Sequence, residues 1–289
     1  MKRYFIIYLA SLLLLFNACD RTTKEKQLLS KQQRMEQRRQ DSLALKVGVT
    51  PTMDCLPLFV AKERGMFERD SLMVNFRLRN SHIDLDTLLA GGYIEGAATE
   101  LVRANRLIKN GTPLQYVAHT NLSWKFITNK NQRIKEFRQL ADKMIAMTRF
   151  SATDSLADVA ISKSKVKKGI YKVQINDVKI RLRMLLNNEM DAMLLPEPQA
   201  TTAMLYNHKV IADSAFDNTK VGVIAFRKKA LADARRRSQL ALFIKGYNEA
   251  CDSINKYGLK SYADVISKYT GADSKTINSL PKLKYTHAQ

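Results

Sequence analysis

The chain has 289 residues, enough for two modest domains, and its 45% hydrophobic content is ample for packed cores, which excludes disorder over the whole length. Lys and Arg number 48 against 27 Asp and Glu, and the formal net charge of +21 raises nucleic acid, an anionic membrane or an anionic ligand as partner. The basic residues are dispersed and not interleaved with aromatic residues, so we expect solvated basic faces and no nucleic-acid partner.

The N-terminus has the layout of a secretory signal. Met1 to Arg3 is basic, and Tyr4 to Phe16 is an apolar run too short for a membrane span. Asn17-Ala18-Cys19 follows at once, and the segment resembles a bacterial lipoprotein signal, whose cysteine becomes the acylated first residue of the mature protein. The alternative is an ordinary cleaved signal with a chance cysteine. Either way we expect an exported protein from which residues 1–18, the signal peptide, are removed.

Residues 19–45 are polar and rich in Lys, Arg, Gln and Ser, without a sustained apolar face. Gln27 to Leu45 contains neither Gly nor Pro and has the composition of a charged, frayed helix. A lipid-anchored domain needs a spacer to stand away from the membrane. We therefore predict that residues 19–45 form a tether.

The folded part opens on a strand, helix and strand between Lys46 and Leu78. Val47 to Val49 is a short apolar strand, and a helix of about eleven residues follows, with Pro57 in its first turn and Gly65 at its end. A second strand runs from Met73 to Leu78. The ligand-binding face of such a unit lies at the carboxyl end of its first strand, here Thr50 to Cys55.

Strand and helix patterns then alternate to the end of the chain. After a helix near Asp84, strands are predicted at 93–98, 115–120, 124–129, 144–147, 173–175, 191–195, 210–211 and 221–227. Helices are predicted at 101–109, after 151, and at 178–187, 200–206 and 229–256, with a helical turn at 133–140. This order favours two lobes with mainly parallel sheets: a discontinuous first lobe of residues 46–123 plus 219–289, and a second of residues 124–218.

Candidate ligand-binding residues lie where strands end and helices begin, because free backbone amides and hydroxyl groups there suit a small polar or anionic ligand. Asp54 has two equal interpretations, ligand contact or a helix cap, and for Ser151 capping is favoured over a nucleophilic role. Trp124 either stacks on a ligand ring or fills the core. The predicted set is Thr52, Asp54, Thr99, Glu100, Thr120, Asn121, Ser151, Thr153, Asp154 and Glu197.

The sequence gives little support for catalysis. The histidines His82, His119, His208 and His287 lack the spacing of a zinc site, and Ser151 lacks a Gly-x-Ser-x-Gly context. We expect no catalytic residue, metal or cofactor, and we expect Cys55 and Cys251 to be buried thiols.

Four segments resemble a known family. They are Leu58 to Phe67 with Leu72 to Val74, Leu88 to Ala97, Asn188 to Ala192, and Pro196-Glu197-Pro198. Together they resemble the solute-binding proteins of ABC importers, in the group that includes binders of nitrate, sulfonates, taurine and thiamine pyrimidine precursors. The resemblance implies an α/β protein with the two-lobed type 2 periplasmic-binding fold, each lobe a mostly parallel sheet flanked by helices.

The same resemblance implies a function. A monomeric protein would capture a small solute between its lobes and deliver it to an ABC permease, held to a membrane by the lipid on Cys19 and facing the periplasm or cell surface. Two alternatives stay open: a ligand-sensing or interaction lipoprotein that has lost transport, and a biosynthetic enzyme on the same fold. Export argues against the enzyme, because the relatives of this fold that are enzymes carry out cytoplasmic chemistry.

Overall fold

The computed structural model describes residues 30–166, 169–214 and 221–289 and divides into two units, residues 1–44 and 45–289. The predicted signal and Cys19 lie outside the described residues. Within the first unit, residues 30–43 are helical, and Glu36 forms an exposed ion pair with Arg39. None of the helices in these described ranges combines the length and the apolar character that crossing a bilayer requires.

The first sheet of the second unit has the strand order β2-β1-β3-β10-β4. β1 is parallel to β2 and β3, whereas β10 runs antiparallel to β3 and β4, so four strands share one direction. The strands are β1 (Leu45–Val49), β2 (Val74–Leu78), β3 (Gly96–Glu100), β4 (Leu114–Thr120) and β10 (Gly222–Arg227). All five residues of β3 are buried, as expected of a strand covered on both faces.

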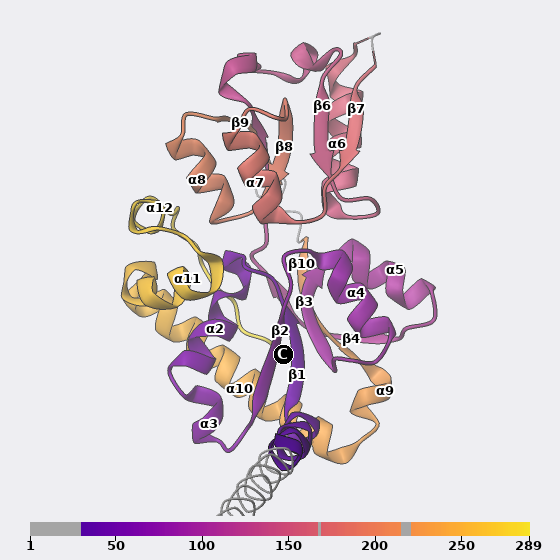
Figure 1. The fold of residues 1–289 in the computed structure, drawn as a ribbon, viewed down its shortest axis with the longest axis vertical. Helices are drawn as coiled ribbons and strands as arrows, with labels where there is room; N and C mark the ends of the chain where they lie inside the picture. The colour runs from indigo at the N-terminus through magenta and orange to yellow at the C-terminus, as the bar shows by residue number, and fades with distance from the viewer. Residues whose placement is uncertain (1–29, 167–168, 215–220) are drawn as a thin grey trace, which may run out of the picture. The chain divides into compact units, whose positions relative to one another are not determined.

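Helices cover both faces of this sheet (Figure 1). One face carries α2 (Leu56–Glu63), α3 (Met66–Arg69) and α10 (Ala234–Tyr257), and the other carries α4 (His82–Ala90) and α5 (Leu101–Lys109). The first core contains Phe67, whose ring stacks on Phe243 with a centroid distance of 5.5 Å. A Cβ on Gly246 would lie 2.7 Å from the Phe67 ring, so this glycine allows α10 to approach α3 closely.

The second sheet has the order β7-β6-β8-β5-β9, and all its strands come from residues 125–213. β5 alone runs against its neighbours β8 and β9. The strands are β5 (Lys125–Thr128), β6 (Met144–Met147), β7 (Tyr171–Gln174), β8 (Ala192–Leu195) and β9 (Lys209–Asp213). One face packs on α6 (Ala152–Ser164), and the other packs on α7 (Val178–Leu186) and α8 (Gln199–Leu205). The predicted α/β fold with two mostly parallel sheets is confirmed.

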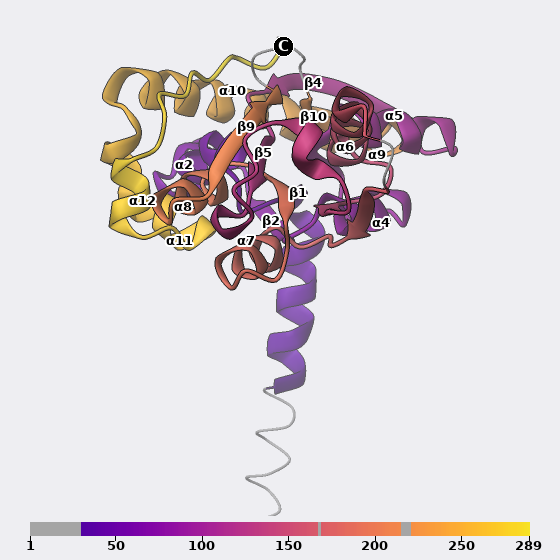
Figure 2. The same ribbon diagram turned by 90° about the horizontal axis from the view of Figure 1, so that it is seen from above.

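The chain after α10 returns along the first lobe and reaches the second. Tyr285 donates its hydroxyl to the Met53 carbonyl at 2.9 Å, and Thr276 lies 3.1 Å, between hydroxyl oxygens, from Thr202 of α8. Figure 1 and Figure 2 show α12 beside α8. The remaining short elements are η1 (Met53–Cys55), η2 (Lys130–Gln132), η3 (Phe137–Leu140), α9 (Lys228–Leu231), η5 (Leu259–Tyr262), α11 (Ala263–Thr270) and α12 (Ser274–Asn278).

One predicted helix ends as expected and another is divided. The helix after β1 ends at Glu63, and Gly65 takes the left-handed conformation at φ 67° before α3 begins, as predicted for a helix that ends at this glycine. The long helix predicted at 229–256 is divided because Asp233 accepts hydrogen bonds from the amides of Arg235 and Arg236 and so caps a new helix, α10.

The two described cysteines, Cys55 and Cys251, are buried free thiols, as predicted. Burial raises the pKa of the Cys251 thiol to about 12 and raises that of Cys55 further. Both sulfurs are therefore protonated and unreactive at neutral pH.

The Phe67 ring should be a main contributor to the stability of the first lobe. Phe67 is fully buried, so Phe67→Ala is expected to lower the free energy of unfolding by about 3–5 kcal/mol in equilibrium urea denaturation. The control is Tyr257→Ala, whose side chain is 59% exposed and should change the value by less than about 0.5 kcal/mol. Equal losses in the two variants would contradict this packing.

Candidate ligand-binding site

The two lobes meet at the carboxyl ends of β1 and β3. Because these strands are parallel, their ends lie at one edge of the first sheet. Glu100, at the end of β3, accepts a hydrogen bond from the Ala152 amide of the second lobe at 3.0 Å. Beyond the end of β1, the Met53 amide donates to the Glu197 carbonyl at 2.9 Å, and Gln199 Nε2 donates to the Pro51 carbonyl at 3.0 Å. The lobes are thus closed on each other by direct hydrogen bonds.

Arg181 of α7 is the largest fully buried side chain of the described residues. Its guanidinium donates to the Ile175 carbonyl at 2.6 Å, to the Leu194 carbonyl at 3.0 Å and to the Thr148 hydroxyl at 2.5 Å. No ion pair with a carboxylate forms within the described chain. Burial lowers the pKa of Arg181 to about 10, so it remains a cation at neutral pH.

Trp124 lies between Arg181 of the second lobe and His82 of the first lobe. The Arg181 guanidinium lies 5.7 Å from the centre of the Trp124 ring, and His82 at the start of α4 meets that ring edge-on at 6.1 Å between centroids. His82 Nε2 is 3.4 Å from the Thr50 hydroxyl. Burial, followed by the charges of Arg103 and Arg181, lowers the pKa of His82 to about 3, so the imidazole is neutral.

Glu100 and Arg103 complete the group from the first lobe. Arg103 is buried and ion-paired with Asp86. Burial raises the pKa of Glu100 to about 7, although the Ala152 amide and the charges of Arg103 and Arg181 oppose the rise. We refer to Thr50, His82, Thr99, Glu100, Arg103, Trp124, Thr148 and Arg181 as the interlobe site.

Several polar atoms of this site have no hydrogen-bond partner among the described residues. They are two donors, Arg103 Nε and Trp124 Nε1, and two oxygens, Thr99 Oγ1 and Glu100 Oε1. Buried polar atoms in folded proteins are nearly always hydrogen-bonded, so four of them among the residues on the two sides of this interlobe contact make it a candidate place for a polar ligand.

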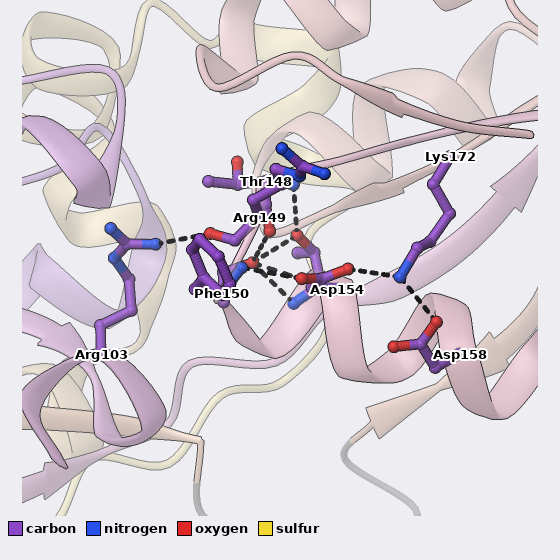
Figure 3. A network of polar contacts seen from close by, with 9 residues as sticks. Arg103, Thr148, Arg149, Phe150, Asp154, Asp158 and Lys172 are labelled. Atoms are coloured by element: carbon purple, nitrogen blue, oxygen red, sulfur yellow. Dashed lines mark hydrogen bonds and ion pairs between the residues drawn. The ribbon is translucent and has the colours of Figure 1, made fainter. Parts of the chain in front are cut away.

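The loop between β6 and α6 closes the rim of the site (Figure 3). Arg103 Nη1 donates to the Arg149 carbonyl across the lobes at 3.2 Å. Phe150 takes a left-handed φ of 58°, and its amide donates to Asp154 at 2.8 Å. Lys172 forms ion pairs with Asp154 at 2.7 Å and Asp158 at 2.6 Å. The Arg106 guanidinium of the first lobe lies 3.9 Å from the centre of the Phe150 ring.

The structure brings some of the predicted residues together at this contact. Thr99 and Glu100 belong to the interlobe site, and Thr52 lies beside it, with its hydroxyl 2.8 Å from that of Thr50. Ser151 caps α6 by accepting from the amides of Thr153 and Asp154, and Thr153 accepts from the Thr148 amide. Asp154 accepts a hydrogen bond from the Phe150 amide and forms an ion pair with Lys172 at the rim.

The other predicted residues lie toward the crossings between the lobes. Thr120 donates to Asp54 Oδ2 at 3.3 Å, while Asp54 Oδ1 has no partner in the described chain and α2 has no side-chain cap. Asn121 donates to the Lys284 carbonyl at 3.1 Å. Glu197 is ion-paired with Lys125 at 3.0 Å and accepts from Thr201. Most of their polar atoms are engaged in holding the crossing segments, whereas Asp54 Oδ1 and Asn121 Oδ1 lack partners among the described residues.

Sequence reasoning did not select His82, Arg103 or Arg181. Arg181 lies between Val178 and Leu185 at a spacing of three and four residues, so it falls on the apolar stripe of its helix. Arg103 is likewise buried in α5 beside Ala104 and Leu107. The sequence feature that could have identified both arginines is a charged residue on the buried face of an amphipathic helix, because such a charge needs a partner.

A sequence model of the NMT1-like family matches residues 38–256, more than half of the chain. No curated protein sequence matches this chain significantly.

Solved structures similar to this one share its fold at low sequence identity. The ligand-binding component of an ABC-type import system from Staphylococcus aureus, solved with zinc bound, has a TM-score of 0.71 and 15% identity, covering 85% of this chain and 86% of that one. The periplasmic nitrate-binding protein NrtA from Synechocystis PCC 6803 has a TM-score of 0.70 and 16% identity, covering 81% and 68%. The alkanesulfonate-binding protein SsuA from Xanthomonas axonopodis pv. citri, bound to MOPS, has a TM-score of 0.68 and 15% identity, covering 84% and 86%.

These comparisons confirm the periplasmic-binding-protein fold and the resemblance drawn from the sequence. Among residues 30–166, 169–214 and 221–289, no cluster of three or more His, Cys, Asp or Glu side chains has the arrangement of a metal site.

The ion pairs of Lys125 should control the stability of the crossing. Its Nζ lies 3.0 Å from Glu197 and 3.1 Å from Asp213, all three side chains being largely buried. Burial opposes the charge, but the two carboxylates outweigh it and raise the pKa of Lys125. Lys125→Met removes the cation shared by these two buried carboxylates and should cost about 3 kcal/mol of unfolding free energy at pH 8.

Urea denaturation at pH 8 measures this loss, with the exposed Lys135→Met as control. A loss no larger than that of the control would show that the crossing does not depend on Lys125.

Proposed function

This chain belongs to the NMT1-like family, and we propose that it is the substrate-binding protein of an ABC importer. In this proposal the lobes, residues 46–123 plus 219–289 and residues 124–218, open and close around a small polar or anionic organic solute. The observation that carries it is the interlobe site: a buried arginine without a carboxylate partner, next to polar atoms of both lobes that lack partners in the described chain.

The chemistry of the site favours an anionic group on the solute. Arg181 is a cation, and Arg103 Nε and Trp124 Nε1 are further donors. The neutral His82 adds no charge, and Glu100, with a pKa of about 7, sheds its own negative charge as it takes up a proton. The nitrate and alkanesulfonate binders with the same fold support an anion by analogy. In the closed protein the Trp124 ring contacts His82 and Arg181, and opening of the lobes would let it pack against an organic part of the solute.

The proposal includes a place in the cell. The lipoprotein-like signal supports acylation of Cys19, with residues 19–45 as the tether and an ABC permease as the partner that receives the solute. The protein would act as a monomer on the periplasmic or outer side of a membrane. It would act without catalysis and without a cofactor.

Solute binding can be tested by thermal shift and calorimetry with alkanesulfonates, nitrate, small carboxylates and pyrimidines. A solute at a hundred times its dissociation constant should raise the unfolding free energy by about 2.7 kcal/mol. Arg181→Met should weaken binding of that solute roughly 10- to 100-fold, because it removes a charge-assisted hydrogen-bonding group. The control is Arg183→Met, an exposed arginine on the same helix.

The Glu197→Ala variant tests whether Glu197 contacts the solute or only stabilises the crossing segment. An unchanged affinity would remove Glu197 from the site, and a lower one would include it. If none of these solute classes stabilises the protein, the transport proposal fails and an interaction lipoprotein without a transported solute becomes the better account.

Anchoring is tested separately. Cys19→Ser should shift the protein from the membrane fraction to the soluble fraction of lysed cells, because the acylated residue is lost. Detection of the protein in both fractions uses an antibody or a C-terminal tag, and a Cys251→Ser variant serves as the control. Continued membrane association of Cys19→Ser would contradict the lipid anchor.

A further inference from the structure

Two titratable side chains are buried where the lobes touch, and each belongs to the first lobe while contacting the second. Glu100 accepts from the Ala152 amide, and His82 packs edge-on against Trp124. Glu100 is 1% exposed and His82 is 6% exposed. If the lobes separate, as the proposed function requires, both side chains lose the cover that the second lobe provides.

The contacts of Glu100 favour its neutral form in the closed protein. Only one of its carboxylate oxygens, Oε2, is bonded, and Oε1 has no donor among the described residues. The charged groups that act on it are Arg103 of α5, Arg181 of α7 and Asp86 of α4. Arg103 is already paired with Asp86, and Arg181 is bonded to carbonyls and to Thr148, so neither guanidinium pairs with Glu100.

The contacts of His82 favour its neutral form as well. The cations Arg103 and Arg181 are the charges that act on it, with Asp177 acting on Arg181 from the start of α7. The hydrogen-bonding neighbour of its Nε2 atom is the neutral hydroxyl of Thr50. A second cation beside two guanidinium groups would be repelled in this buried place.

We propose that Glu100 and His82 act as a compensating pair that makes closure of the two lobes nearly independent of pH. In mildly acidic solution the open protein holds an imidazolium and a carboxylate, and the closed protein holds an imidazole and a carboxylic acid. For these two groups the number of bound protons is the same in both states, because the proton lost by His82 on closing is matched by the one that Glu100 gains. Closure then neutralises both groups without net exchange of protons with the solvent.

The direction of each contribution follows from its pKa. Glu100 rises from an ordinary 4.5 to about 7 in the closed protein, so this group favours closure increasingly as pH falls from 7 toward 4.5. His82 falls from an ordinary 6.5 to about 3, so this group opposes closure increasingly as pH falls below 6.5. The pH range over which Glu100 favours closure overlaps most of the pH range over which His82 opposes it.

The single tryptophan makes the closure measurable without a known solute. Trp124 is the only tryptophan in the chain, is 3% exposed in the closed protein and meets His82 of the first lobe edge-on, so separation of the lobes should increase its quenching by neutral acrylamide. Between pH 8 and pH 5, the closed-to-open ratio of the wild type should change by less than about fivefold. Over the same range the ratio should fall roughly 30-fold in Glu100→Gln, where His82 acts alone, and rise roughly 70-fold in His82→Gln, where Glu100 acts alone.

Matched controls are Glu189→Gln and His119→Gln, which make the same chemical changes at exposed positions and should follow the wild-type profile. Circular dichroism at each pH checks that every variant is folded, and either site variant alone is sufficient for the test. Opposite slopes in the two variants support the pair. Profiles that match the wild type in both variants, including a Trp124 that stays protected at every pH, would overturn it. A solute that stabilises the protein in the thermal-shift screen would leave the proposed function standing even then.

Discussion

The guanidinium of Arg181 donates to two main-chain carbonyls and one hydroxyl of the second lobe, and it does so entirely out of contact with water. These bonds tie α7 to the end of β8 and to the end of β6, and so fix the edge of the second sheet that meets the first lobe. Transfer of a charge from water is costly unless hydrogen bonds replace its hydration. The second lobe supplies those bonds, but no opposite charge, and the cation therefore shapes the electrostatics of everything placed against it.

The groups of the first lobe respond to that charge. His82 remains a neutral imidazole beside it, and the carboxyl of Glu100 lies near both arginines without pairing to either. Asp86 neutralises Arg103, which leaves Arg181 as the cation of the interlobe site without a carboxylate partner in the described chain. The arrangement combines positive charge, unpartnered donors and an aromatic ring, which are the elements that recognise an anion with an organic part.

The fold follows from local patterns, whereas the site depends on how the lobes meet. Short apolar strands that alternate with helices predict a parallel α/β sheet, and Gly65 and Ser151 mark a helix end and a helix start in the sequence itself. Thr99 and Glu100 could be selected because they end a strand. Arg181 could not be assigned a partner in this way, since its neighbours Thr148 and Trp124 are distant in sequence and are brought together only by the second sheet.

The position of β10 has a consequence for the order of folding. This strand lies between β3 and β4 and pairs with both, although it follows them in sequence by about a hundred residues. As the chain is synthesised, β4 has no strand to pair with until residues 222–227 arrive, whereas the whole second sheet is complete by residue 213. The second lobe is therefore able to fold first, and the first sheet is completed afterwards by a long-range step of the kind that limits folding rates.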